Sequence, residues 1–230
     1  MEMTFKHTPY NATALNVYEN QNLAIGFTEN EFLLDDLERI FPQTRMTHLK
    51  QIHSNIIVLN SGAKGDVEGD GLLIREKKVV AVIKTADCVP LFFWNDSYTI
   101  AGILHIGWKG LLNGIEQKLL NLFFNEELPL DQFHFFTGPA IESTCYEVGP
   151  ELYESFAGKH YGDKIFTPKG KGKFWLDIKR GISLSLMDSG VDAQRISHSP
   201  LCTYCLYPRF PSYRKNGKTG QRIYNFILLK

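Results

Sequence analysis

The sequence has few cysteines and no long apolar run. Its 230 residues include four cysteines, Cys88, Cys145, Cys202 and Cys205, which are too few for a disulfide framework and fit a reducing compartment. The N-terminal residues carry acids and polar side chains where a secretory signal needs an apolar segment. No stretch approaches the roughly 20 apolar residues that span a membrane. We therefore expect a cytoplasmic protein with no membrane partner.

A charge surplus is also missing. Lys and Arg together number 25, as do Asp and Glu, so the formal net charge is zero. This balance argues against a nucleic-acid partner, since proteins that bind nucleic acids are typically basic. The hydrophobic share of 43% is that of an ordinary globular protein. A chain of this length buries a sizeable core, and we expect one domain over residues 1–230.

Several common catalytic motifs do not occur. The sequence has no P-loop, no dinucleotide-binding G-x-G-x-x-G and no G-x-S-x-G nucleophile elbow, which argues against nucleotide-binding folds of those types and against a Ser-His-Asp hydrolase. It also has no internal repeat and no low-complexity tract. Any chemistry must therefore come from other residues, among them cysteine and histidine.

Apolar periodicity predicts interleaved strands and helices. The predicted strands are Gln51–Asn60, Lys78–Thr85, Val89–Trp94, Tyr98–Ile106, Gln132–Gly138, Gln194–Ser199 and Arg222–Lys230. One predicted helix begins at Trp108, because Trp108, Leu111, Leu112, Ile115, Leu119, Leu122 and Phe123 recur at spacings of three and four. Two more helices are predicted over Gly149–Gly162 and Phe174–Gly190, and Thr167–Lys173 is the most linker-like segment. Hairpin-like strand pairs among helices favour an α+β fold.

The stretch from Thr85 to Trp108 places a cysteine and a histidine at the two ends of a predicted hairpin. With the turn centred on Asp96 and Ser97, Cys88 faces His105 on the neighbouring strand. Directly opposed residues have Cβ atoms about 4.5–5.5 Å apart. This separation suits two ligands of one ion, since Zn–S is about 2.3 Å and Zn–N about 2.0–2.1 Å.

His53 is the nearest residue of a suitable type to complete the site. One cysteine, two histidines and a position open to water are typical of a catalytic zinc site, and Asp87 is placed to orient one of the ligands. The alternative is that Cys88 is a small core residue and that the histidines bond to the backbone.

A second candidate metal site lies in "SHSPLCTYC". His198, Cys202 and Cys205 have ligand-like spacing, and Cys202-x-x-Cys205 is half of a zinc ribbon. A redox pair is the other interpretation, but the loop-like flanks lack the strand-to-helix setting of a thioredoxin motif.

Two further segments carry polar side chains suited to a substrate. Tyr207–Arg222 concentrates basic residues, and arginine forks match phosphate or carboxylate oxygens. Ser212 and Tyr213 add hydroxyl donors. The basic residues of this segment are Arg209, Arg214, Lys215, Lys218 and Arg222. We expect it to bind a small anion; the alternative is a solvated basic loop.

The segment Thr137–Glu151 contains two Gly-Pro turn signals that flank Cys145, Tyr146 and Glu147. Glu147 is a candidate base or hydrogen-bond acceptor for a substrate. The alternative interpretation is that it is a surface acid beside a helix.

Five motifs in order carry a resemblance to a known family. "QIH", "TADCVP", "HIGWKG", "GPAIESTCYEVG" and "FPSYRKNGKTGQR" resemble the YfiH family, also called the laccase-domain or multicopper polyphenol oxidoreductase family. The resemblance runs from about Leu49 to the C-terminus. It implies that His53, Cys88 and His105 bind one metal ion, usually zinc, and it gives "HSPLCTYC" no metal role.

The resemblance also implies a fold and an activity. The family fold is a four-layer α/β/β/α arrangement with mixed β-sheets. Members resemble purine nucleoside enzymes that carry out phosphorolysis of adenosine, inosine or methylthioadenosine, and adenosine deamination. The implied partners are a nucleoside and phosphate. Copper-dependent oxidation of phenols and editing of peptidoglycan precursors are the alternative activities, and a structural metal module is the non-enzymatic one.

Three features depart from the family pattern. The N-terminal segment Gly26–Leu37 is shortened relative to the usual Gly-Gly-x-Ser and Asn-Leu-Gly stretch. Ser54 stands where Gly is usual. Lys109 stands where Arg is common, and we expect it to bind substrate or phosphate. These departures bear on substrate choice and leave the three metal ligands intact, and the oligomeric state stays open.

Overall fold

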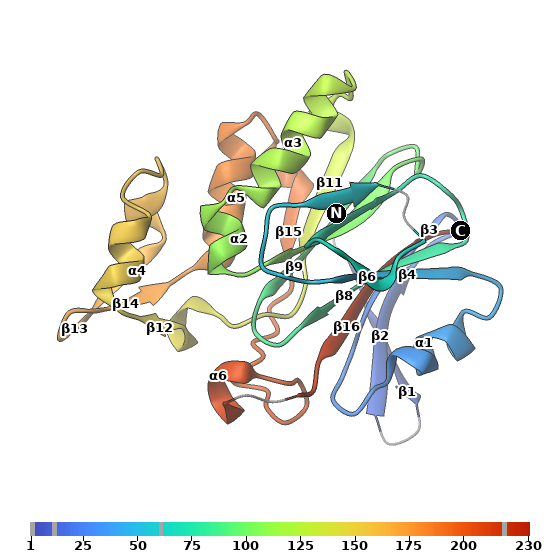
Figure 1. Ribbon diagram of the computed structural model, residues 1–230, viewed down its shortest axis with the longest axis horizontal. Helices are drawn as coiled ribbons and strands as arrows, with labels where there is room; N and C mark the ends of the chain where they lie inside the picture. Colours follow the sequence, from blue (N-terminus) through green and yellow to red (C-terminus); the bar gives the residue numbers. More distant parts are fainter. Residues whose placement is uncertain (1–2, 11–12, 60–61, 218–219) are drawn as a thin grey trace.

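The protein folds into four layers (Figure 1). The computed structural model describes residues 3–10, 13–59, 62–217 and 220–230. Helix α1 covers one face of a seven-stranded sheet, whose other face packs on a six-stranded sheet, and helices α2, α3 and α5 cover the outer face of that second sheet. The predicted α+β class and the four-layer α/β/β/α arrangement are therefore confirmed.

The strands and helices have the following bounds. The strands are β1 Lys6–Tyr10, β2 Thr13–Glu19, β3 Leu23–Thr28, β4 Arg45–Lys50, β5 Ile57–Leu59, β6 Lys64–Glu68, β7 Gly71–Ile74, β8 Val79–Thr85, β9 Val89–Asn95, β10 Ala101–Ile106, β11 Phe133–Thr137, β12 Glu147–Val148, β13 Phe166–Gly170, β14 Lys173–Leu176, β15 Ile196–His198 and β16 Ile223–Leu229. The α-helices are α1 Leu34–Ile40, α2 Trp108–Leu112, α3 Ile115–Asn125, α4 Pro150–Ser155, α5 Ile178–Asp188 and α6 Tyr213–Asn216, with 3₁₀ turns at Leu130–Gln132, Ser143–Cys145, Gly162–Lys164 and Ala193–Arg195.

The seven-stranded sheet is mixed, in the order β1-β2-β3-β16-β8-β4-β6. Strand β4 runs parallel to β6 and β8, and the other pairs are antiparallel. Alternation along β8 explains how both faces are covered, since successive side chains point to opposite faces. Val80 and Val82 pack with Leu37 of α1, whereas Ala81 and Ile83 pack against the second sheet.

The six-stranded sheet has the order β15-β11-β9-β10-β7-β5 and is also mixed. Its central strand β9 is buried on both faces. Phe92 and Trp94 point into the core between the sheets, and Leu91 and Phe93 point toward the helices. The uninterrupted apolar run of β9 follows from this position, because a strand covered on both faces has no solvent-facing side.

The hairpin of β9 and β10 pairs two residues away from the predicted register. His105 lies opposite Pro90, not Cys88, because the turn is centred one residue later than predicted, between Ser97 and Tyr98. Asn95 bonds across to Ile100, and its side-chain Oδ1 accepts the N–H groups of Thr99 and Ile100 at 2.9 and 3.0 Å. A shift of two leaves each side chain on its predicted face, so Cys88 and His105 still share the face between the sheets.

The predicted strand over Gln51–Asn60 is wrong for most of its length. Only Ile57–Leu59 forms a strand, and Asn60 lies outside the described residues. His53 has a φ of 58°, which an extended strand does not allow. The backbone N–H groups around it bond to a carboxylate side chain and not to a neighbouring strand.

The helix predicted from Trp108 is two helices. The chain breaks between α2 and α3 at Gly114, which has a φ of 69°. Glycine adopts this left-handed conformation without the steric penalty of other residues. The apolar spacing carries across the break, so the core-facing side was predicted and the break was not.

The remaining helix boundaries differ for local reasons. Phe174–Leu176 belongs to strand β14, and α5 begins only after Asp177, whose carboxylate accepts the Arg180 N–H at 2.9 Å as an N-cap. The helix predicted over Gly149–Gly162 ends at Ser155. The linker-like Thr167–Lys173 belongs to a hairpin of the small β12-β14-β13 sheet: Thr167–Gly170 lies in β13, Lys173 begins β14, and the turn between them has Gly170 and Gly172 at positive φ.

None of the helices among the described residues is both long and apolar enough to cross a membrane.

Candidate metal centre and cavity

His53, Cys88 and His105 come together at one end of the two sheets. One potential ligand atom from each lies within 4.8 Å of the others, and the two imidazole ring centroids are 4.8 Å apart. His105 is buried at the end of β10, Cys88 is half-buried just before β9, and His53 is exposed on the loop after β4. The three sequence-predicted ligands therefore form one cluster that is open on the His53 side.

Asp70 holds two of these ligands in place. This carboxylate is fully buried and accepts the N–H groups of His53 at 3.0 Å and Ser54 at 2.6 Å, together with the Ser54 hydroxyl at 2.7 Å. It also lies 2.8 Å from Nδ1 of His105. A carboxylate on Nδ1 fixes the ring and leaves Nε2 as the nitrogen available to a metal.

The sequence analysis did not identify Asp70 and predicted instead that Asp87 orients a ligand. The carboxylate of Asp87 instead accepts the Thr203 hydroxyl at 2.6 Å and the Arg214 backbone N–H at 2.7 Å. Asp87 therefore ties the C-terminal part of the chain to the segment that carries Cys88. In the sequence, Asp70 stands in a Gly-Asp-Gly stretch 17 residues after His53, and the fold brings its carboxylate to the loop that carries His53.

The electrostatics of the cluster favour a thiolate. Burial opposes ionisation of Cys88, but the charge and hydrogen bonds of His105 and His53 outweigh it and lower the pKa of the thiol to about 6. Burial likewise opposes protonation of His105, yet Cys88 and Asp70 raise the pKa of its ring to about 9. Asp70 stays ionised, because its hydrogen bonds to His105 and Ser54 outweigh burial and lower its pKa to about 2.

These residues fit a zinc ion. Zinc takes cysteine thiolate and neutral imidazole in sites that keep one position open, and binding displaces the protons that the ligands carry. Gly107 makes room beside the cluster, since a Cβ atom there would lie 2.9 Å from Cys88 Sγ and 3.4 Å from the His53 ring. The donor set, the carboxylate behind His105 and the space at Gly107 agree with one another.

A cavity of about 820 Å³ opens over the cluster. Its polar and aromatic lining includes Lys84, Asp87, Lys109, Tyr146, Tyr213 and Arg214. The Arg214 guanidinium lies 4.9 Å from the ring centroid of Tyr146, and the pKa of the Tyr146 hydroxyl is raised to about 12 by burial and by the nearby negative charge of Cys88. A space of this size admits a ligand with several polar groups.

The structure separates the other predicted site residues into two groups. Lys109, Tyr213 and Arg214 line the cavity. Ser212 is buried and caps α6 by accepting the Lys215 N–H at 3.1 Å, so its hydroxyl has a local role. Glu147 lies in an adjoining cavity of about 430 Å³ and forms an ion pair with Lys169, which lowers the pKa of its carboxyl.

The basic segment Tyr207–Arg222 divides in the same way. Arg214 and Arg222 face the cavity, whereas Arg209 pairs with Glu29 at 2.7 Å. Lys215 lies over the ring of Tyr204, 4.4 Å from its centroid. Lys218 lies outside the described residues.

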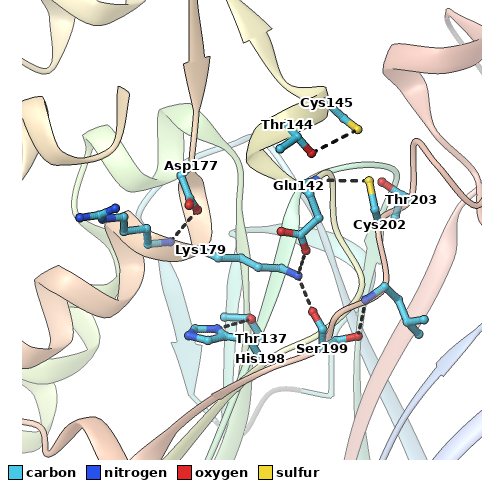
Figure 2. Close-up of polar contacts among 12 residues, drawn as sticks. Thr137, Glu142, Thr144, Cys145, Asp177, Lys179, His198, Ser199, Cys202 and Thr203 are labelled. Atoms are coloured by element: carbon cyan, nitrogen blue, oxygen red, sulfur yellow. Dashed lines mark hydrogen bonds and ion pairs between the residues drawn. The ribbon is translucent and has the colours of Figure 1, made fainter. Parts of the chain in front are cut away.

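A second cluster of possible metal ligands consists of three cysteines, and the sequence predicted only two of them. Cys202 and Cys205 of "SHSPLCTYC" are joined by Cys145 and not by His198, and one sulfur from each lies within 4.8 Å of the others. Nδ1 of His198 lies 2.8 Å from the Thr137 hydroxyl (Figure 2), and its Nε2 lies 3.1 Å from the Ser183 hydroxyl. Sequence spacing does not reveal Cys145, because it lies far from Cys202 along the chain.

A family and several relatives match this chain. The family model described as "Multi-copper polyphenol oxidoreductase laccase" matches residues 7–230. A "Purine nucleoside phosphorylase" of Clostridium acetobutylicum is 31% identical over 98% of this chain and 93% of its own length. The "Purine nucleoside phosphorylase YlmD" of Bacillus subtilis is 34% identical over 70% of the chain and 59% of its own length. An "Adenosine deaminase RL5" from an unknown prokaryotic organism is 29% identical over 70% of the chain and 62% of its own length.

Solved structures share the fold. The Bacillus licheniformis protein YfiH superposes with a TM-score of 0.84 at 26% identity, covering 96% of this chain and 100% of its own. YlmD from Geobacillus stearothermophilus superposes with a TM-score of 0.86 at 23% identity over the full length of both chains.

Proposed function

The chain belongs to the multi-copper polyphenol oxidoreductase laccase family, and we propose that within it the protein is a zinc-dependent enzyme of purine nucleosides. The proposed reactions are phosphorolysis of adenosine, inosine or methylthioadenosine and deamination of adenosine. The names of the relatives from Clostridium acetobutylicum, Bacillus subtilis and the unknown prokaryote support this choice.

One observation carries the proposal: the cluster of His53, Cys88 and His105 lies in the wall of a cavity that also holds basic side chains. A structural zinc site is typically closed by four protein ligands. Among the residues that the structure describes, the cluster consists of three. This supports an enzyme over a structural metal module.

The chain's own side chains divide the work. Arg214 and Lys109 bring positive charge to the cavity and would hold phosphate against C1′ of the ribose. Tyr146 and Tyr213 offer aromatic faces for the purine. His53, Cys88 and His105 would hold a zinc ion, which would supply Lewis-acid polarisation and activated water for attack at C6 of adenosine.

Proton transfer is proposed for a carboxylate. Asp87 lines the cavity, held in place by Thr203 and the backbone of Arg214. Glu147 is placed less favourably, because Lys169 binds its carboxylate and lowers its pKa. Of the two carboxylates, Asp87 is therefore the one that we propose for proton transfer.

Product analysis by chromatography tests the function. Zinc-loaded protein is incubated with adenosine, with and without phosphate, beside a Cys88→Ala variant. Inosine without phosphate indicates deamination, and adenine with ribose 1-phosphate only when phosphate is present indicates phosphorolysis. We expect either product and its loss in the variant. No turnover by protein that holds zinc contradicts the proposal and directs the search to phenols with copper and to peptidoglycan precursors.

A further inference from the structure

The three cysteines outside the candidate active site converge from two separate segments. Cys145 ends the 3₁₀ turn Ser143–Cys145, and Cys202 and Cys205 lie on the loop after β15. The Sγ atoms of Cys145 and Cys205 are 3.3 Å apart, and all three sulfurs lie within 4.8 Å of one another. Sulfurs bound to one tetrahedral zinc ion are about 3.8 Å apart, given a Zn–S distance of about 2.3 Å.

The backbone holds these segments together without a metal. Ala140 pairs with Cys202 as a β-bridge, and the N–H of Thr203 bonds to the Ala140 carbonyl at 3.0 Å. The Glu142 N–H points at Cys202 Sγ at 3.5 Å. Main-chain contacts therefore bring the three cysteines together without a bound ion, as a specific metal site requires.

The polar side chains around the sulfurs are already engaged (Figure 2). Glu142 is bound by Lys179, whose ammonium also donates to the Ser199 carbonyl at 2.7 Å. His198 bonds to Thr137 and Ser183, as described above. Figure 2 draws the sulfurs of Cys145 and Cys202, whose contacts there are long: 3.9 Å to the Thr144 hydroxyl and 3.5 Å to the Glu142 N–H, so both sulfurs remain able to bind a cation.

A cation would bind here in exchange for the thiol protons, because the thiolate and not the thiol is the metal ligand.

We propose that Cys145, Cys202 and Cys205 form a second metal site, which takes a soft closed-shell cation, Zn²⁺ or Cu⁺, through three thiolates. Thiolate ligands favour Zn²⁺ and Cu⁺ over hard cations such as Mg²⁺ and Ca²⁺. Cys205 is exposed, so a fourth position is open to solvent. The ion would fasten the segment before Tyr146 to the loop that carries Thr203, and both of these residues belong to the structure around the cavity.

The test is metal stoichiometry of the full chain under anaerobic, reducing conditions. Wild type, Cys205→Ser, Cys88→Ser and the double variant are stripped with chelator, loaded with Zn²⁺ or with Cu⁺, desalted against a weak chelator, and measured by mass spectrometry of the metal. Exposed Cys205 is the least disruptive residue to change, and thermal unfolding checks that each variant folds.

We expect two ions per wild-type chain, one in each single variant and none in the double variant, for at least one of the two metals. The metal that reaches these ratios identifies the native class. A Cys205→Ser protein that holds as much metal as wild type overturns the proposal. So does a reduced wild type with one ion that is lost only with Cys88, or a Cys145–Cys205 disulfide that persists under reductant. Retention of a cation by Cys88→Ser separates this site from the active site, whatever the outcome for nucleoside turnover.

Discussion

Asp70 Oδ1 lies 2.8 Å from Nδ1 of His105 and 3.0 Å from the backbone N–H of His53, so one buried carboxylate positions two of the three candidate ligands. The third ligand, Cys88, lies just outside the hairpin strand opposite His105. The candidate metal centre thus rests on a carboxylate that is fully buried.

Replacing Asp70 with Asn should weaken zinc binding. Carboxylates behind ligating histidines are typically worth 10–100-fold in metal affinity, so we expect a loss of about that size. Competition with a chromogenic chelator measures it. Asp66→Asn is the control, since Asp66 is exposed on β6 and lies outside the cluster. Unchanged affinity in folded Asp70→Asn would show that His105 is oriented without it.

Gly107→Ala should disturb the cluster by a steric clash alone. The new Cβ atom would lie 2.9 Å from Cys88 Sγ, a distance that forces the thiol to move. We expect zinc affinity to fall about tenfold or more, as for other losses of ligand geometry. Gly110→Ala is the matched control, because the nearest atom is 3.5 Å away and alanine favours a helix over glycine by roughly 0.5–1 kcal/mol. Equal zinc affinity in both variants would contradict the packing argument.

Arg214→Ala should separate the two proposed reactions. A charge-assisted hydrogen bond contributes about 1.5–3 kcal/mol, so the KM for phosphate should rise roughly 10–100-fold while deamination without phosphate changes less. Steady-state kinetics at varied phosphate gives the answer. Arg209→Ala, in the same basic segment but paired with Glu29, should behave as wild type. A phosphate KM that moves in Arg209→Ala and not in Arg214→Ala would reverse the assignment.

Glu116 makes stability depend on pH away from the active site. Burial raises the pKa of its carboxyl from 4.5 to about 7, and a hydrogen bond from Ser185 at 2.9 Å only partly opposes this. The folded state therefore binds a proton that the unfolded state releases between these two values. The stability contributed by the protonated form is present at low pH and is lost as pH rises through about 7.

Glu116→Gln should remove this dependence. Between about pH 5 and about pH 7.5, the free energy of unfolding of wild type should fall by about 2 kcal/mol relative to the variant. Urea unfolding of both proteins at the two pH values measures the difference, and effects of the other titrating groups cancel. Parallel pH profiles would mean that Glu116 ionises in the folded protein as it does in the unfolded one.

The sequence predicted which three side chains come together better than it predicted the local structure that carries them. Cys88 and His105 were placed on one face from a register that is wrong by two residues, and the face was right because side chains alternate with a period of two. His53 was selected by residue type, although it lies in a loop at positive φ and not in a strand. The four-layer arrangement was predicted from the family resemblance. The apolar run of β9 is consistent with it, because this strand is covered on both faces.

The roles of several site residues could not be predicted from the sequence, because they depend on tertiary contacts. Asp70 acts through residues far from it along the chain, and Asp87, which is adjacent to a ligand in sequence, bonds elsewhere. Cys145 reaches Cys202 and Cys205 only because Ala140 pairs with Cys202 in the fold. Ser212 had the chemistry of a substrate donor, but its hydroxyl is needed at the N-terminus of α6.

Anomalous diffraction at the zinc absorption edge, from crystals of zinc-loaded protein, tests the central claim most directly. We expect a peak about 2.0–2.3 Å from a nitrogen of His53, Nε2 of His105 and Sγ of Cys88, with the fourth direction facing the cavity. No peak between these three side chains, or a fourth protein ligand that closes the site, would contradict an open metal centre and the activity proposed for it.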